Sequence, residues 1–256
     1  MKRTNGTHGS TQEVATTSRR PGMEEVTAPK SKRGRPAGGK KDLSTIDVGK
    51  LMVKPSVMTI TIAGLTPLLV HNFGSKAIKQ ILDKQTGEAK PGPRAKKDPF
   101  EDFKESLYVM NPKKLPKNRL SVGQHWGYLP DTFGFPESAF KKAMVQACSF
   151  VEGVPKTWIR GLVHIYGGEN GLLPIKYSKV VMRQDTVRIG NFGSKTADIR
   201  FRAEFHDWSV KLLIRYNRSA ITPEQIAMLI NNAGFAVGVG EWRPEKDGSH
   251  GTFAIE

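Results

Sequence analysis

The first 50 residues contain no aromatic side chain and no periodic pattern of apolar residues, so any folded core has to be built from the rest of the chain. This segment is rich in Ser, Thr, Gly, Pro, Lys and Arg. Such a composition buries too little apolar surface to offset the entropy lost on ordering. We therefore predict a disordered basic tail over 1–50 and a folded domain over 51–256.

Positive charge is distributed over both parts of the chain. The net charge is +16, and the tail, with eleven basic and five acidic side chains, accounts for +6 of it. A folded part with the remaining +10 favours an anionic partner, either a nucleic acid or an anionic membrane. No stretch approaches the ~20 apolar residues of a membrane span, and the N-terminus lacks the apolar run of a secretory signal. We expect a cytoplasmic protein with a nucleic-acid partner and no membrane contact.

Two helices and their flanking strands are predicted in βαββαβ order. Val57–Ile62 alternates apolar residues with threonines, the pattern of a half-buried strand. One helix is expected to begin at Pro136, and another at the capping box Thr222–Gln225, with Gly234 as its left-handed cap. Thr252–Ile255 is the final strand. This order indicates an α+β fold with a ferredoxin-like (RRM-like) core and insertions.

Three further strands are predicted before the second helix, over 179–189, 199–205 and 210–216. We expect the last two to form a hairpin around His206–Ser209, apolar on one face. Its opposite face would carry four cations, Arg200, Arg202, Lys211 and Arg215. That face is either a nucleic-acid surface or an ordinary solvated strand face.

Residues 84–119 are rich in Lys and Pro and are interpreted as an insertion. Its basic side chains are Lys113, Lys114, Lys117 and Arg119. They are candidates for an arm over a bound strand, and the alternative is a mobile, solvated loop.

The tail contains a short motif that resembles an AT-hook. Its core residues are Arg33, Gly34, Arg35 and Pro36. The narrow, negative minor groove of A·T-rich DNA attracts inserted arginines, and a glycine lets the backbone approach the groove floor. The alternative is a generic basic tail that binds phosphates without preference.

A glycine-rich loop, Gly234–Gly251, connects the second predicted helix to the last strand. It is not a nucleotide-binding P-loop, because it lacks the Gly-Lys-Ser/Thr ending and runs from helix to strand. Glycines allow backbone amides to approach a phosphate closely. The candidate binding residues here are Gly238, Gly240, Trp242, Arg243 and Lys246. Trp242 is expected either to stack on a base or to pack in the core.

These features together resemble the RAMP superfamily, which forms the RNA-binding backbone of CRISPR effector complexes. The resemblance rests on the glycine-rich loop, on Leu65–Val70 after the first strand, and on Phe135–Ala143 at the first helix. It spans 57–256 in short patches and implies a ferredoxin-like RNA-binding core. The run Gly248–Phe253 departs from the family because it lacks the arginine of a typical basic glycine-aromatic-glycine ending.

The sequence thus predicts a non-enzymatic nucleic-acid-binding protein. It would track single-stranded RNA or DNA through phosphate contacts and base stacking, and it would contact duplex DNA through its tail. Homo-oligomers along the strand are a further option. No cofactor, metal site or catalytic residue is predicted. One alternative is a metal-independent endoribonuclease using a histidine, with His71 or His250 as the candidate. Another is a structural subunit of a nucleoprotein filament or virion. CRISPR, phage and other mobile-element contexts all remain open.

Overall fold

The computed structural model describes residues 53–88, 97–168, 170–190 and 196–256, which all belong to one compact unit, Val48–Glu256. The basic tail and its AT-hook-like motif, Arg33–Pro36, lie outside the described residues. Both therefore stay predictions.

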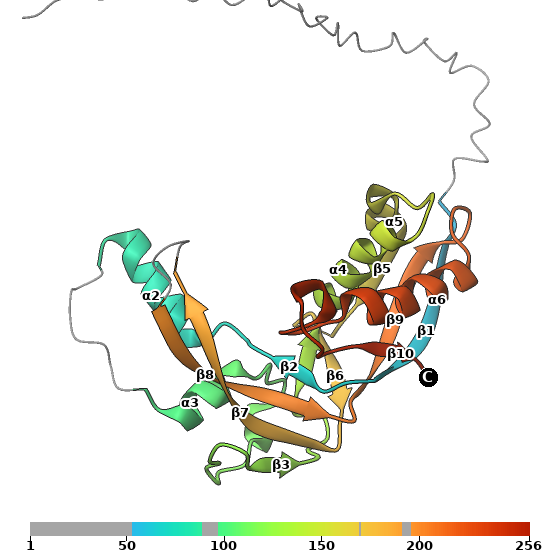
Figure 1. Ribbon diagram of the computed structural model, residues 1–256. Coiled ribbons are helices and arrows are strands. Elements are labelled where there is room, and N and C mark those ends of the chain that lie inside the picture. The colour runs from blue at the N-terminus through green and yellow to red at the C-terminus, as the bar shows by residue number, and fades with distance from the viewer. Residues whose placement is uncertain (1–52, 89–96, 169, 191–195) are drawn as a thin grey trace, which may run out of the picture. The chain divides into compact units, whose positions relative to one another are not determined.

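The described residues form a mixed α+β structure (Figure 1). The strands are β1 (Pro55–Gly64), β2 (Leu68–Val70), β3 (His125–Gly127), β4 (Gly134–Pro136), β5 (Val163–Tyr166), β6 (Leu172–Lys176), β7 (Lys179–Ile189), β8 (Thr196–His206), β9 (Ser209–Asn217) and β10 (Phe253–Ile255). The helices are α2 (Ser75–Thr86), α3 (Pro99–Ser106), α4 (Glu137–Ala147), α5 (Lys156–Leu162) and α6 (Pro223–Asn232). Short helical turns are η2 (Pro112–Lys114), η3 (Cys148–Phe150), η4 (Ala233–Val237) and η5 (Pro244–Lys246).

The first sheet, sheet A, has the ferredoxin-like order β10-β1-β9-β5, with every neighbouring pair antiparallel. In chain order these strands are the fourth, first, third and second of the βαββαβ core, with α4 and α6 as its two helices. Strand β6 pairs with the start of β9, and β4 pairs with β6. The predicted fold class is confirmed, although its second strand, β5, was not among the strands predicted.

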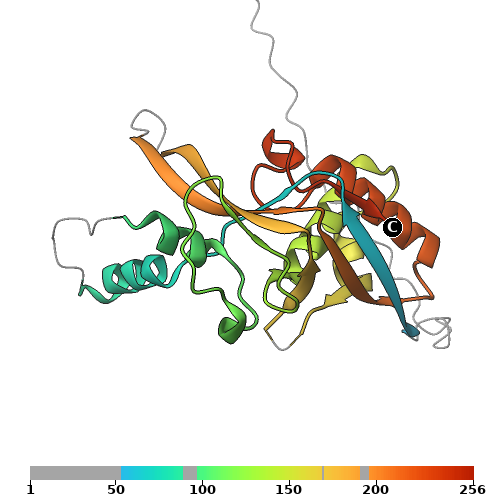
Figure 2. The same cartoon turned by 90° about the horizontal axis from the view of Figure 1, so that it is seen from below.

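The second sheet, sheet B, has the order β2-β8-β7-β3. The predicted hairpin between residues 199–205 and 210–216 is wrong, because β8 pairs with β7 while β9 pairs with β1. Only Asp207 and Trp208 separate β8 from β9, so the chain changes sheets there (Figures 1 and 2).

Trp208 explains this change of sheet. Its indole is 1% exposed and donates through Nε1 to the carbonyl of Thr66 at 2.8 Å. The amide of Gly64 donates to the carbonyl of Trp208 at 2.7 Å, and a Cβ at Gly64 would lie 2.1 Å from the indole nitrogen. The tryptophan therefore packs where a turn residue of a hairpin would face solvent.

One hydrophobic core contacts both sheets. Helix α4 supplies Phe140 and Met144 to this core, each 1% exposed. The insertion over 84–119 is partly folded, because α3 within it buries Phe100 and Phe103. Asp98 caps α3 by accepting from the amides of its first turn.

The second core helix begins as predicted and ends differently. Thr222 and Gln225 form the capping box at the start of α6. Gly234 is not its left-handed cap, since the chain continues through η4 to Gly238, where φ is 68°. Gly234 is required for packing instead, because a Cβ there would lie 1.8 Å from the carbonyl oxygen of Phe253.

Candidate nucleic-acid interface

A cleft of about 600 Å³ lies between α4 and the glycine-rich loop. Its basic lining residues are Lys141, Lys142, Arg160 and Arg243, and its acidic ones are Glu241 and Glu245. His71, Tyr108 and Phe135 also contribute to the walls. The cleft therefore has an excess of positive charge next to apolar and aromatic surface.

The first turn of α4 forms part of this cleft. Pro136, Ser138 and Ala139 line it, and the N-terminus of α4 has no side-chain cap. The carboxylate of Glu137 is directed elsewhere, accepting from the amide of Gly167. The amide of Glu137 donates to the carbonyl of Gly171 at 3.0 Å, and the next amides of the first turn have no side-chain cap. Such a helix N-terminus carries partial positive charge and favours an anion such as phosphate.

The four cleft cations differ in their partners. Lys141 donates to the carbonyls of Ile159 and Arg160 at 3.0 and 3.1 Å, and burial lowers the pKa of its ammonium. Arg243 forms an ion pair of 2.7 Å with Glu245. Lys142 and Arg160 are exposed and form no ion pair with any described carboxylate. These two side chains are the cleft cations left to meet an anionic ligand.

Backbone hydrogen bonds within the glycine-rich loop and to the segments beside it hold the loop in place. The amides of Gly238, Val239 and Gly251 donate to carbonyls of Ala233, Gly251 and Pro67 at 2.8–2.9 Å. The expected phosphate cradle is therefore wrong for the Gly238 amide, which is already engaged. Gly240, with φ of 80°, is needed for close packing on β2, because a Cβ there would lie 2.4 Å from the carbonyl oxygen of Leu69.

Trp242 lies at the rim of the loop, between the two predicted environments. Its side chain is 37% exposed, and its φ is 51°. The guanidinium of Arg183 lies 5.1 Å from the ring centroid, and the ring of His250 packs edge-on at 6.0 Å. Trp242 thus anchors the loop on β7 while part of its ring stays accessible. Lys246 is exposed in η5.

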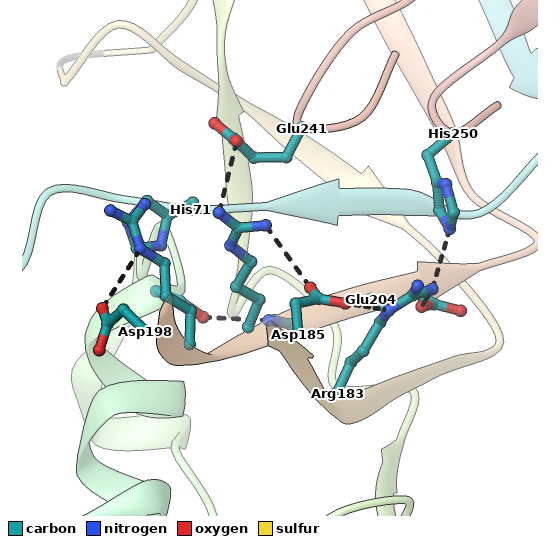
Figure 3. Close-up of polar contacts among 11 residues, drawn as sticks. His71, Arg183, Asp185, Asp198, Glu204, Glu241 and His250 are labelled. Atoms are coloured by element: carbon teal, nitrogen blue, oxygen red, sulfur yellow. Dashed lines mark hydrogen bonds and ion pairs between the residues drawn. The ribbon is translucent and has the colours of Figure 1, made fainter. Parts of the chain in front are cut away.

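An ion network, of which Asp185 and Arg202 are buried, joins the glycine-rich loop to sheet B (Figure 3). We use this name for Arg183, Asp185, Arg202, Glu204 and Glu241. Asp185 accepts from Arg183 at 2.8 Å and from Arg202 at 3.5 Å, and Arg202 reaches Glu241 of the loop at 3.6 Å. Glu204 pairs with Arg183 at 2.7 Å. Arg202 is 2% exposed and Asp185 is 3% exposed.

The predicted four-cation face is therefore divided between two sheets, and the expectation of one surface is wrong. Arg202 is buried in the ion network, and Arg200 lies 4.0 Å from Asp198. Lys211 and Arg215 are exposed on β9 in sheet A. The hydrophobic alternation of β8 and β9 is real, but the two strands do not share a face.

The insertion cations also have unequal partners. Arg119 forms two hydrogen bonds of 2.6 and 2.7 Å with Asp98. Lys114 donates to the carbonyl of Pro130 at 3.0 Å. Lys113 and Lys117 are exposed and form no ion pair with the described carboxylates.

Two histidines contact arginines beside the loop. Nε2 of His250 lies 3.0 Å from Arg183, and Nε2 of His71 lies 3.5 Å from Arg200. Nδ1 of each ring is buried without a partner among the described residues. A general base needs a ring nitrogen within reach of the substrate, so this geometry favours a structural role for both.

Both histidines are held neutral by their surroundings. Burial lowers the pKa of His71, and Arg202 and Arg200 lower it further. Burial also lowers the pKa of His250, with Arg183 as the next cause. Each histidine therefore binds a proton more readily in the unfolded chain than in the folded one.

We expect this difference to make the protein less stable in mild acid. The unfolded state gains protons below about pH 6.5, so the free energy of unfolding falls by up to ~1.4 kcal/mol per pH unit for each histidine. Urea unfolding at pH 7.5, 6.5 and 5.5 measures this slope. His71→Asn and His250→Gln should each flatten it, and an equal slope in the double variant would contradict the assignment.

The strand order defines this chain as an α+β protein with a ferredoxin-like core. No family model and no curated protein matches it. Solved structures that are similar to it include "Crystal structure of Cmr6 from Pyrococcus furiosus", with 10% identity and a TM-score of 0.37, covering 80% of this chain and 100% of that one. Another is "Cryo-EM structure of the Type III-B Cmr-beta bound to cognate target RNA", with 11% identity and a TM-score of 0.35, covering 82% of this chain and 61% of that one. Both TM-scores are below 0.5, so we rest the fold on the strand order alone.

No helix of the described residues is long and apolar enough to cross a membrane. Nor do the described His, Cys, Asp and Glu side chains form a group that could hold a metal ion.

Proposed function

We propose that this chain binds single-stranded nucleic acid in the cleft between α4 and the glycine-rich loop, without cleaving it. The proposal rests on two features of the same cleft. The N-terminus of α4 has no side-chain cap, and two cations, Lys142 and Arg160, have no ion-pair partner among the described residues. Both features favour a phosphate group. Trp242 lies on the same loop but outside the cleft lining, and its accessible part offers a ring for a base beyond the cleft.

The finer parts of the proposal extend from this cleft. A RAMP-like role would place the chain along an RNA strand, with copies of the chain side by side. The tail would contact A·T-rich duplex DNA through Arg33 and Arg35. The proposal covers both RNA and DNA as the single strand, and it includes oligomers of the chain along that strand.

Removing the two unpaired cleft cations is expected to weaken single-strand binding. Lys142→Ala combined with Arg160→Ala should raise the Kd for a fluorescein-labelled 20-nucleotide oligo(U) or oligo(dT) about tenfold at 0.1 M salt. Each lost phosphate contact should also reduce the slope of log K against log salt by about 0.7. Fluorescence anisotropy of the full chain at several salt concentrations measures both effects.

A matched control changes the same charge at another exposed site. Lys79→Ala with Lys84→Ala on α2 removes two exposed lysines away from the cleft lining and should leave the slope nearly unchanged. Binding that is absent or insensitive to salt in the wild-type chain would refute the proposal. Cleavage of the labelled RNA in the presence of EDTA would favour the ribonuclease alternative instead.

A further inference from the structure

The side of sheet A opposite α4 and α6 is open. On β1, β5 and β9 alternate residues point into the core, and the residues between them point outward. Among the outward residues, Val57 is 61% exposed, Leu213 is 43% exposed and Tyr166 is 42% exposed. The described part of the chain therefore leaves a sheet face with apolar and aromatic side chains exposed.

The strands of this face carry positive charge, and one carboxylate lies at its edge, on Glu256, whose amide donates to the carbonyl of Thr61 at 3.1 Å. None of the strands of sheet A, which are β1, β4, β5, β6, β9 and β10, contains an aspartate or a glutamate. Lys176, Lys211 and Arg215 are exposed, and no ion pair joins them to a described carboxylate. In sheet B, by contrast, Arg183 is paired with Glu204 and Arg202 with Asp185, each across neighbouring strands.

The strand register places these groups in neighbouring rows. Arg215 lies between His164 and Val57, and Leu213 lies between Tyr166 and Thr59. The next outward residue along β9, Lys211, pairs with Thr61. Lys211 and Arg215 are four residues apart and hence about 13 Å apart along the strand. The aromatic and apolar row thus lies between two cationic rows.

A hollow of about 240 Å³ lies at one end of the face. Tyr166, His164 and Arg215 line it, together with Val53 and Pro55 at the start of the described chain. Proteins that bind single-stranded nucleic acids combine these features. An exposed ring stacks on one base, and a cation beside it contacts the phosphate.

We propose that this open face of sheet A is a second surface for single-stranded nucleic acid, separate from the cleft. Tyr166 stacks on a base, and Lys211 and Arg215 contact phosphates on either side of it. The inference rests on the proposed nucleic-acid binding and adds a second place on the molecule where the strand is held. Lys176 and Lys211 on this face disfavour a protein partner, because lysine is depleted from protein–protein interfaces.

The test uses the full chain and variants of exposed residues, which leave the core untouched. Lys211→Ala with Arg215→Ala should raise the Kd for labelled oligo(U) or oligo(dT) about tenfold at 0.1 M salt and reduce the salt slope by about 1.4. Tyr166→Ala should raise the Kd about tenfold, whereas Tyr166→Phe keeps the ring and should stay within about twofold of the wild type. Ultraviolet crosslinking of an iodouridine oligonucleotide should label the peptide that contains Tyr166.

Lys79→Ala with Lys84→Ala again serves as the charge-matched control, and thermal melting confirms that each variant folds. If the sheet variants bind like this control while the cleft variants remain weakened, the second surface is refuted and the cleft proposal stands. If the wild-type chain binds neither oligonucleotide, the proposed function itself fails. Equal losses in Tyr166→Phe and Tyr166→Ala would also contradict stacking, because the phenyl ring is retained in one of them.

Discussion

Replacing Arg202 with alanine is expected to lower the free energy of unfolding by about 3–5 kcal/mol. Arg202 is 2% exposed and contacts both Asp185 and Glu241. Its removal leaves the buried Asp185 with one cation in place of two, and it opens a cavity in sheet B. Urea unfolding at pH 7.5, followed by tryptophan fluorescence, measures the loss.

The neighbouring Arg200 provides the control. It is one-third exposed and lies 4.0 Å from Asp198, so Arg200→Ala should cost less than about 1 kcal/mol. If Arg202→Ala does not yield folded protein, Arg202→Met keeps most of the volume and isolates the loss of charge. A loss in Arg202→Ala no greater than in Arg200→Ala would show that the ion network does not stabilise the fold.

Gly251→Ala is expected to lower the free energy of unfolding by about 3 kcal/mol or more. The φ of Gly251 is 67°, and a Cβ there would lie 1.8 Å from the carbonyl oxygen of Val239. Because this oxygen belongs to the backbone, Val239 would have to move to make room for the Cβ. That movement would break the hydrogen bond from the Val239 amide to the Gly251 carbonyl. The strained dihedral angle and the steric clash with Val239 therefore both destabilise the glycine-rich loop in this variant.

Gly123→Ala separates these two effects. Gly123 has a φ of 85°, but a Cβ there would meet no atom within 4 Å. Its substitution should cost only the dihedral strain, about 1–2 kcal/mol. Thermal or urea unfolding of the two variants measures the difference. Equal losses would mean that the close approach in the glycine-rich loop relaxes, and that the loop is softer than its hydrogen bonds imply.

The sequence predicts those elements whose signals are local. The alternation of Val57–Ile62, the proline before α4 and the capping box at Thr222 each identify an element, because each depends on contacts within a few residues. Their order is sufficient for the ferredoxin-like topology. The four residues of β5 were not predicted, since so short a strand is defined by its pairing with β9 rather than by its composition.

Strand pairing is where the sequence analysis goes wrong. Two amphipathic strands separated by Asp207 and Trp208 have the spacing of a hairpin, and local periodicity does not distinguish a turn from a change of sheet. The distant residues Gly64 and Thr66 decide the matter by packing on Trp208. For the same reason the sequence does not show that Arg202 is buried while Lys211 is exposed. The two residues lie in different sheets, and the sheet determines which of them is covered.

The cleft was only partly predictable. The sequence singled out Arg243 and the glycines, but not Lys142 or Arg160, which enter the cleft from α4 and α5. The Lys-Lys pair following Phe140 was visible in the first helix, but its orientation depends on how α4 packs against the loop. Asp185 and Glu241 were missed for a similar reason, since the partners of a buried arginine lie far from it in the chain.

The short link at Asp207–Trp208 also has a mechanical consequence. The indole of Trp208 is buried, and backbone hydrogen bonds hold the residues on both sides of the link. The link therefore leaves little freedom for one sheet to rotate relative to the other. A displacement of the paired strands β7 and β8 should therefore be transmitted to β9, which is a central strand of the other sheet. We therefore expect the two sheets to move together when a ligand displaces β7 and β8.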